Sequence, residues 1–208
     1  MKKYNEIIEH YEKCLEKHGD THLGVDWPNI EHVNLRYNIM LDMLKFKNLD
    51  SNVSILDFGC GTAHLYEHIL TLGLNGIDYS GLDISKKFID VCNLKYPEID
   101  FYCGDVLDSN FKIQNFDFVI MNGVFTEKRG LSFEEMFDYF KLLIDKVYSI
   151  CDKGVSFNVM SKHVDWERDD LFHLPHDLLT SYLCSNITRN YILRNDYGLY
   201  EYTVYLYK

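Results

Sequence analysis

The stretch SILDFGCGTAHLYEHIL, residues 54–70, decides the fold that we expect for this chain. Residues 53–58 form a short apolar run that predicts a buried parallel strand, and residues 62–72 predict a helix. Between the two, Gly59 and Gly61 allow positive φ angles and let a ligand approach the backbone closely. The helix that follows offers free backbone N–H groups at its start. The stretch therefore predicts a ligand-binding turn between a strand and a helix.

Strand and helix patterns alternate along the rest of the chain. Further helices are expected at residues 4–18, 30–47, 85–96 and 175–184, and one more is expected to begin at Ser132, which forms an S-x-x-E capping box with Glu135. Further strands are expected at residues 79–84, 99–103, 116–121, 154–160, 188–194 and 200–207. A short turn joins the last two strands, so they must be antiparallel. The prediction is an α/β fold: a Rossmann-like seven-stranded, mostly parallel sheet with an antiparallel last strand, helices on both faces and an N-terminal helical cap.

The composition narrows the class of protein. The chain has 208 residues, which suits one domain, here read as a helical cap at residues 1–49 and a main unit at residues 50–208. The formal net charge is −11 and no run of Lys or Arg stands out, so a small-molecule substrate is expected rather than nucleic acid. No apolar run is long enough for a membrane span, and none of the six cysteines forms a CxxC pair. We therefore expect a reduced, cytoplasmic protein without a membrane partner.

Acidic residues accompany three successive predicted strands. Asp57 precedes the glycine turn, Asp83 ends the second strand, and Asp105 lies just past the third. Ligands of open α/β sheets bind at the carboxyl ends of the strands, where a carboxylate such as Asp83 can accept both hydroxyls of a ribose. A dinucleotide fingerprint, G-x-G-x-x-G, fails because its third glycine position is occupied by His64, and Ala63 instead completes a G-x-G-x-[GA] pattern. These acids predict a nucleoside-containing ligand without a bound pyrophosphate.

The motifs LDFGCGTAHL, GLDIS, CGDVLD and FDFVIMNGV resemble, in this order, the successive motifs of class I S-adenosylmethionine-dependent methyltransferases. The resemblance covers roughly residues 50–208 and implies a methyltransferase with S-adenosyl-L-methionine as its cofactor. It implies that Asp57 reaches the cofactor's ammonium group, that Asp83 holds the ribose, and that Asp105 faces the adenine amine. The full set of cofactor-binding residues expected on this basis is Asp57, Gly59, Cys60, Gly61, Asp83, Ile84, Asp105, Val106, Asn122 and Gly123. Two residues of the second helix, Arg36 and Tyr37, are added as candidates, with Arg36 directed at the cofactor's carboxylate.

A hydroxyl acceptor needs a general base, and the long segment 161–176 that follows the fifth strand is a plausible source. His163 is the first candidate for the base, with Asp165 able to orient it, and His173 and His176 come next. A surface histidine is more often only solvated than catalytic. No metal-ligand set stands out, so no metal site is expected.

The chain's two tryptophans are candidates for binding the methyl acceptor. Asp26-Trp27 in the N-terminal loop echoes Asp165-Trp166, and a carboxylate beside an aromatic face suits a sugar or another polyol. The same pairs are equally expected merely to cover the edge of the core. His22 is a further candidate substrate residue. The chain is also similar to small bacterial methyltransferases associated with surface-polysaccharide synthesis, which favours a sugar, sugar nucleotide or phosphorylated polyol as acceptor.

Four other functions compete with this one. An N-methyltransferase of a small amine has the same cofactor motifs, and so has a relative that binds the cofactor without transferring the methyl group. A nicotinamide oxidoreductase is disfavoured by His64 and by the lack of a Tyr-x-x-x-Lys pair beyond the fourth strand. Nucleic-acid N-methylation is disfavoured because the position of its [DNS]-P-P-[YFW] signature reads MNGV here.

Overall fold

The structure of the protein is a computed structural model that describes residues 4–46 and 52–208. The helices are α1 (Asn5–His18), α2 (Ile30–Leu41), the 3-10 helix η1 (Asp42–Phe46), α3 (His64–Thr71), α4 (Lys86–Lys95), α5 (Phe133–Ser149) and α6 (His176–Asn186). The strands are β1 (Val53–Phe58), β2 (Ile77–Asp83), β3 (Asp100–Cys103), β4 (Phe116–Phe125), β5 (Cys151–Ser161), β6 (His173–Leu174), β7 (Tyr191–Arg194) and β8 (Glu201–Tyr207). The predicted end of the second helix at residue 47 and the predicted cap boundary at residue 49 lie outside the described residues.

One sheet organises the described residues. Its strand order is β3-β2-β1-β4-β5-β8-β7, and the two-residue strand β6 pairs with β5 beside this path. Strands β1 to β5 pair in parallel, whereas β8 is antiparallel to both β5 and β7. The predicted Rossmann-like, mostly parallel sheet with a reversed last strand is confirmed. Strand β6 was not expected, because two residues are too few to give a sequence pattern.

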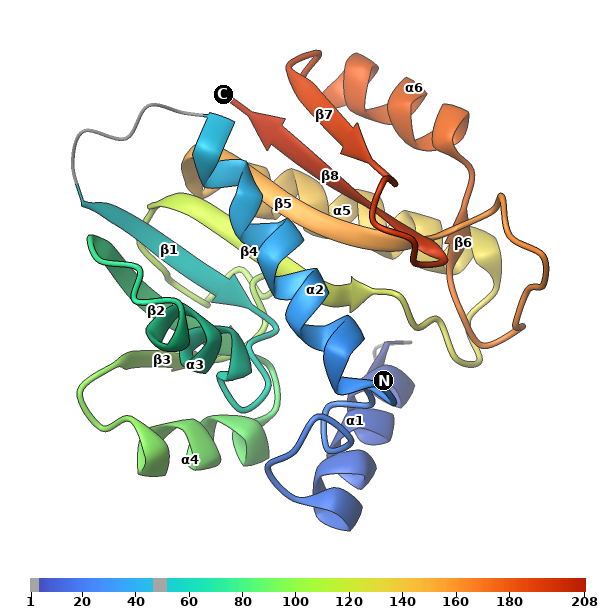
Figure 1. Ribbon diagram of the computed structural model, residues 1–208. Coiled ribbons are helices and arrows are strands. Elements are labelled where there is room, and N and C mark those ends of the chain that lie inside the picture. The colour runs from blue at the N-terminus through green and yellow to red at the C-terminus, as the bar shows by residue number, and fades with distance from the viewer. Residues whose placement is uncertain (1–3, 47–51) are drawn as a thin grey trace.

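Helices cover both faces of the sheet (Figure 1). On one face, α5 and α6 pack on the apolar side chains of β4, β5 and β8, with Phe140 of α5 at the centre. On the other face, Val33, Tyr37 and Met40 of α2 share a second apolar cluster with Ile55 of β1. The second helix is therefore part of the layered core, while α1 lies near the carboxyl ends of the parallel strands, where its Ile7 joins the first cluster (Figure 1).

The serines that precede α5 and α4 behave differently. The capping box at α5 is present, because Ser132 Oγ accepts from the Glu135 N–H and Glu135 Oε2 accepts from the Ser132 N–H. At α4, however, Ser85 makes no side-chain cap. Its hydroxyl donates to Glu12 of α1 at 2.6 Å, and its N–H donates to Asp83 Oδ1 at 2.9 Å. A contact with a distant helix thus replaces the local cap.

No helix was expected between the third and fourth strands, and the structure agrees. Residues 104–115 are described throughout and contain no helix.

Among residues 4–46 and 52–208, no helix has both the length and the apolar character that crossing a membrane requires. A cytoplasmic location stays a prediction.

Candidate cofactor and acceptor site

A cavity lies at the carboxyl ends of β1, β2 and β4, beneath α1. It brings together residues that are far apart in the sequence, from the N-terminal segment to the end of β4. All ten residues that the motifs assign to the cofactor line this cavity, together with Tyr37: Asp57, Gly59, Cys60, Gly61, Asp83, Ile84, Asp105, Val106, Asn122 and Gly123. Of the predicted substrate residues, Trp27 lines it as well.

The turn after β1 needs its glycines. Gly59 and Gly61 have φ angles of +73° and +53°, in the left-handed region that side chains disfavour. A Cβ atom on Gly59 would lie 2.9 Å from Val124 Cγ2, which is too close for a real contact. Ala63, which stands where a third glycine is usual, also has a positive φ, of 64°. The turn therefore keeps its backbone accessible to the cavity at the expense of some strain at Ala63.

Asp57 is a buried carboxyl in the cavity wall. Its Oδ2 accepts a hydrogen bond of 2.7 Å from the Tyr79 hydroxyl, and its side chain is 2% exposed. Burial raises the pKa of Asp57 to about 7, which the Tyr79 hydrogen bond partly offsets and the charge of Asp83 reinforces. A cation in the cavity would favour the ionised form of this carboxyl.

Asp83 sits at the end of β2 with both oxygens engaged by backbone. Oδ2 accepts from the Gly61 N–H at 3.1 Å and Oδ1 from the Ser85 N–H at 2.9 Å. Burial raises the pKa of Asp83 to about 6, while the hydrogen bonds from Ser85 and Gly61 act in the opposite direction. The carboxyl thus ties the glycine turn to the start of α4 and keeps lone pairs for a ligand, since each carboxylate oxygen can accept more than one hydrogen bond.

The third acid is held by the N-terminal helix. Asp105 Oδ2 accepts a 2.5 Å hydrogen bond from the Tyr4 hydroxyl, and Oδ1 accepts from the Leu107 N–H at 2.9 Å. Tyr4, which directly precedes α1, and Ile7, Ile8 and Tyr11 of α1 all line the cavity. The sequence analysis predicted a helix over these residues but did not assign them to the site, because the docking of an isolated helix leaves no local signal.

At the end of β4, Asn122 and Gly123 bring polar backbone and side-chain atoms to the cavity. The Gly123 N–H donates to Asn158 Oδ1 at 2.7 Å, and φ at Gly123 is +83°. A Cβ atom on Gly123 would lie 2.8 Å from the Trp27 ring. Asn122 Oδ1 is buried and has no hydrogen-bond partner within the described part of the chain. This amide oxygen is available to a ligand that brings a donor.

Arg36 does not line the cavity. Its guanidinium makes a paired ion contact with Glu201 at 2.8–2.9 Å and lies 4.1 Å from the centre of the Trp27 ring. His22 also acts on Trp27, since its Nδ1–H donates to the Trp27 carbonyl at 2.6 Å. Both residues therefore position Trp27 in the cavity wall.

The residues predicted to be catalytic, His163, Asp165 and His176, are not in the cavity lining. The rings of His163 and His176 are 5.2 Å apart, and His176 packs edge-on against Tyr202 at 4.3 Å. Burial lowers the pKa of His176. Trp166, a predicted substrate residue, is 45% exposed and packs on Tyr200. The catalytic and substrate roles of these residues stay predictions.

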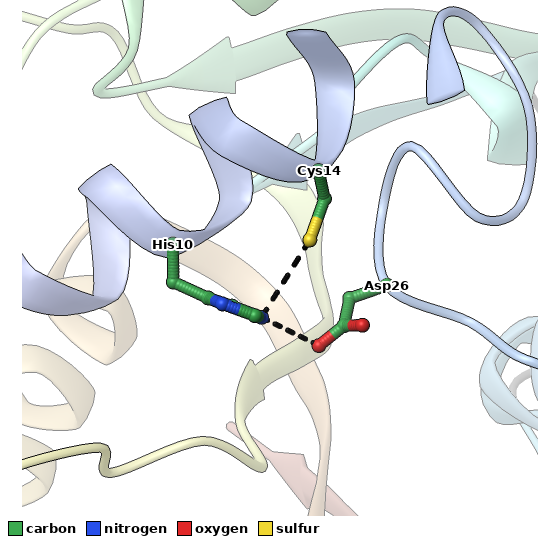
Figure 2. Close-up of side chains that lie close together, drawn as sticks. All are labelled: His10, Cys14 and Asp26. Atoms are coloured by element: carbon green, nitrogen blue, oxygen red, sulfur yellow. Dashed lines mark hydrogen bonds and ion pairs between the residues drawn. The ribbon is translucent and has the colours of Figure 1, made fainter. Parts of the chain in front are cut away.

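A polar cluster that the sequence analysis did not identify lies beside the cavity. His10 of α1 and Asp26 of the following loop point toward one another, with His10 Nε2 and Asp26 Oδ2 2.6 Å apart, and Cys14 Sγ lies 3.7 Å from the same nitrogen (Figure 2). Asp26 was predicted as a substrate residue, but it lies in this cluster and not in the lining. The only hint in the sequence was the i, i+4 spacing of His10 and Cys14, which places both on one helix face.

Three ligand-type atoms of this cluster lie within 4.8 Å of one another, as a metal site would require. The guanidinium of Arg129, however, contacts the same His10 nitrogen and lies 3.5 Å from Asp26. A divalent cation bound there would face this positive charge at close range. We therefore describe the cluster as a network of hydrogen bonds and ion pairs.

Arg129 also contacts two acids of the main unit. Its Nε lies 3.0 Å from Glu127 Oε2, and its Nη1 donates to Asp170 Oδ2 at 3.1 Å. Burial raises the pKa of Glu127 to about 7; the Arg129 charge lowers it, and Asp26 and Asp170 raise it further. The cluster is thus a small, partly buried group of opposite charges at the edge of the cavity.

Comparisons with known proteins bear on this site. Residues 55–141, which contain all three acids and the glycine turn, match the family model described as a methyltransferase domain. The protein is 25% identical over 166 residues to a protein of Mycobacterium tuberculosis named "Putative methyltransferase Rv1506c", and the match covers 77% of this chain and 96% of the relative.

Solved structures share the fold. Magnesium protoporphyrin IX methyltransferase from Synechocystis PCC 6803 with bound SAM superposes with a TM-score of 0.68 at 15% identity, covering 100% of this chain and 98% of that one. The plantazolicin methyltransferase BpumL, in complex with a desmethyl analogue and SAH, gives a TM-score of 0.58 at 14% identity and covers 99% and 98%. Together with the match over residues 55–141 and the cavity at the strand ends, these findings support an S-adenosylmethionine-dependent methyltransferase enzyme. S-adenosyl-L-methionine is its cofactor.

Proposed function

We propose that the protein transfers the methyl group of S-adenosylmethionine to a hydroxyl of a small polar acceptor: a sugar, sugar nucleotide or phosphorylated polyol of the kind used in surface-polysaccharide synthesis. The observation that carries the cofactor half of this proposal is that carboxyls at three successive strand ends face one cavity: Asp57, Asp83 and Asp105. The acceptor half is supported by the polar cluster around His10 and Asp26 beside the cavity and by the resemblance of the chain to polysaccharide-associated methyltransferases.

The residues present suit the cofactor. Asp57 would hold the ammonium group, whose charge stabilises a carboxylate in this buried position. Asp83 would accept the ribose hydroxyls and Asp105 the adenine amine. Asn122 Oδ1, which has no partner among the described residues, would accept from the ammonium end of the ligand. The turn at Gly59 would leave room for the methionyl chain.

When bound, the cofactor supplies a methyl group on a positively charged sulfur. The chain's own contribution is to orient the acceptor, to exclude water beneath α1 and to accept a proton where the acceptor is a hydroxyl. N-methylation of a small amine is the alternative, because a neutral amine needs less help in losing a proton. Acceptors named for the structural relatives belong to those proteins.

The first test is isothermal titration with S-adenosylmethionine, S-adenosylhomocysteine and NAD. We expect binding of the first two and no binding of NAD. Replacing Asp83→Ala should weaken S-adenosylhomocysteine binding by about 1–3 kcal/mol, the cost of leaving ligand hydroxyls without a partner. Replacing the exposed Asp90→Ala on the neighbouring helix is the matched control and should leave the affinity unchanged. Binding of NAD instead would overturn the assignment.

A second test concerns the acceptor. Sugar nucleotides, phosphorylated polyols and small amines are incubated separately with the protein and S-adenosylmethionine, and products are searched for the mass gain of one methyl group. Methylation of a hydroxyl supports the proposal. Methylation of amines alone would replace it with the alternative, N-methylation of a small amine.

A further inference from the structure

The N-terminal segment, α1 with the loop at residues 19–29, occupies positions where the proposed cofactor contacts lie. Val25 Cγ1 would be 3.0 Å from a Cβ on Gly61, and Trp27 packs equally close over Gly123. The Tyr4 hydroxyl is bound to Asp105. The segment therefore covers the part of the cavity that contains the glycine turn and Asp105.

Several polar contacts tie the segment to the main unit, and they differ in strength. Lys87 pairs with Glu12 and Glu16 at 2.7 Å, but its side chain is 50% exposed, and such exposed pairs contribute little. The Arg129 side chain is 21% exposed, and the groups around it are half-buried. Among the partly buried ties are the Arg129 contacts and the ion pair of Lys95, whose side chain is 19% exposed, with Asp20 at 2.7 Å. Of these two, Arg129 contacts both α1, at His10, and the loop, at Asp26.

Arg129 bridges two parts of the protein. In the N-terminal segment, the Arg129 guanidinium contacts His10 and Asp26. These two residues are the sequence neighbours of Tyr11 and Trp27, which line the cavity. From the main unit, Arg129 is held by Glu127 and Asp170. Figure 2 shows how His10 and Asp26, from the helix and from the loop, converge at this point. Arg129 therefore holds both parts of the N-terminal segment, α1 and the loop, in place.

The backbone at both ends of this ion pair is strained. Within the described residues, three residues other than glycine have a positive φ, and two of them are Asp26 at 59° and Arg129 at 48°. Such conformations cost on the order of 1 kcal/mol each and persist only where other contacts enforce them. Strain on both sides of one ion pair indicates a contact that releases strain when it opens and that is kept closed by the attraction between its charges.

We propose that Arg129 is a positioning residue that latches the N-terminal segment over the cofactor cavity, through Asp26 and His10, and so controls how fast the cofactor enters and leaves. The proposal rests on the proposed cofactor site. Breaking the latch raises the fraction of molecules with an open segment, so it speeds entry as well as exit. Damage to the binding site itself would instead slow entry or leave it unchanged while speeding exit.

The test measures association and dissociation rates of S-adenosylhomocysteine by stopped-flow tryptophan fluorescence, to which Trp27 in the cavity wall contributes. In Arg129→Ala, both rates should rise about tenfold, the effect of losing one charge-assisted hydrogen bond, while the dissociation constant changes by less than about threefold. Asp26→Asn should act in the same direction, because asparagine tolerates a positive φ and the change removes charge without adding strain. Arg129→Lys should restore part of the slow exchange.

Arg168→Ala is the matched control, because Arg168 pairs with the same Asp170, is 54% exposed and makes no contact with the N-terminal segment in the described structure. Its rates should equal those of the unmodified protein. The proposal is overturned if both rates in Arg129→Ala and Asp26→Asn stay unchanged, or if association slows. If the unmodified protein does not bind S-adenosylhomocysteine at all, the proposed cofactor site fails instead. Thermal unfolding of each variant confirms that it is folded.

Discussion

Asp57 shows how a binding residue can weaken the protein that carries it. Burial raises the pKa of Asp57 to about 7, above the usual 3.8, and Asp83 is shifted in the same direction. The folded state therefore holds protons that the unfolded state has released between about pH 4 and pH 7. Stability that is present below this window is lost as the pH rises through it. A bound cation would reverse this loss.

The first prediction at this scale is that Asp57→Asn stabilises the ligand-free protein at pH 8. Asparagine can still accept the Tyr79 hydrogen bond but has no charge to bury. We expect a gain on the order of 2 kcal/mol at pH 8 and almost none at pH 4, measured by urea unfolding at both values. Affinity for S-adenosylhomocysteine should fall in the same variant. An equal difference at both pH values would contradict the ionisation argument.

Single residues also mark where sequence reasoning succeeds and where it stops. Asp57, Asp83 and Asp105 could be placed at one cavity because each lies at or just past the end of a strand, and parallel strands end at the same edge. His10 and Arg129 could not, because their contact depends on where α1 docks. Nothing in the local pattern of a helix records which distant loop it will meet.

At the scale of elements, a buried ion pair joins α2 to β8. Arg36 and Glu201 have side chains 11% and 1% exposed, and Asn158 of β5 donates to the same carboxylate at 3.0 Å. Asn158 in turn accepts from the Gly123 N–H at the cavity. One chain of hydrogen bonds therefore connects a helix and three strands to the site.

This network gives the second prediction of the Discussion. Arg36→Ala should destabilise the protein by about 3–5 kcal/mol, because it leaves the Glu201 carboxylate buried without a partner. The double variant with Arg36→Met and Glu201→Met should lose less than the sum of the two single changes. Urea unfolding provides the free energies. Lys86→Ala, which breaks an exposed pair with Asp90, is the control and should change stability by less than about 0.5 kcal/mol.

The start of a helix was predictable where the spacing of its apolar residues and its capping residues agreed. Ser132 and Glu135 marked the start of α5 because both partners of that cap are local. Ser85 precedes α4 in the same way but makes no such cap, since its hydroxyl is used by Glu12 of α1. A tertiary partner can always take a side chain away from the local role that its position suggests.

At the scale of the whole molecule, β8 lies inside the sheet, between β5 and β7. All seven of its residues are buried, and Tyr202, Val204 and Leu206 belong to the main apolar cluster. The reversed last strand could be predicted from the short turn before it. Its place inside the sheet, instead of at the edge, came only with the structure.

A third prediction follows from this position. A chain that ends at residue 198 should lose cooperative unfolding and near-ultraviolet circular dichroism, because removing β8 exposes β5 and leaves β7 without a sheet partner. A chain that lacks only the exposed Lys208 is the control and should unfold as the full chain does. Retention of a cooperative transition in the chain ending at residue 198 would show that the remaining strands suffice.

The same arrangement has a consequence for synthesis. The ribosome makes β5 and β7 before β8, yet β7 pairs within the described sheet through β8. Until β8 emerges, the nascent chain presents β5 as an open edge whose unpaired backbone groups invite association with other chains. Translation pauses just before residue 201, or shortage of a chaperone that shields this edge, should therefore lower the yield of native enzyme without any change in the finished protein.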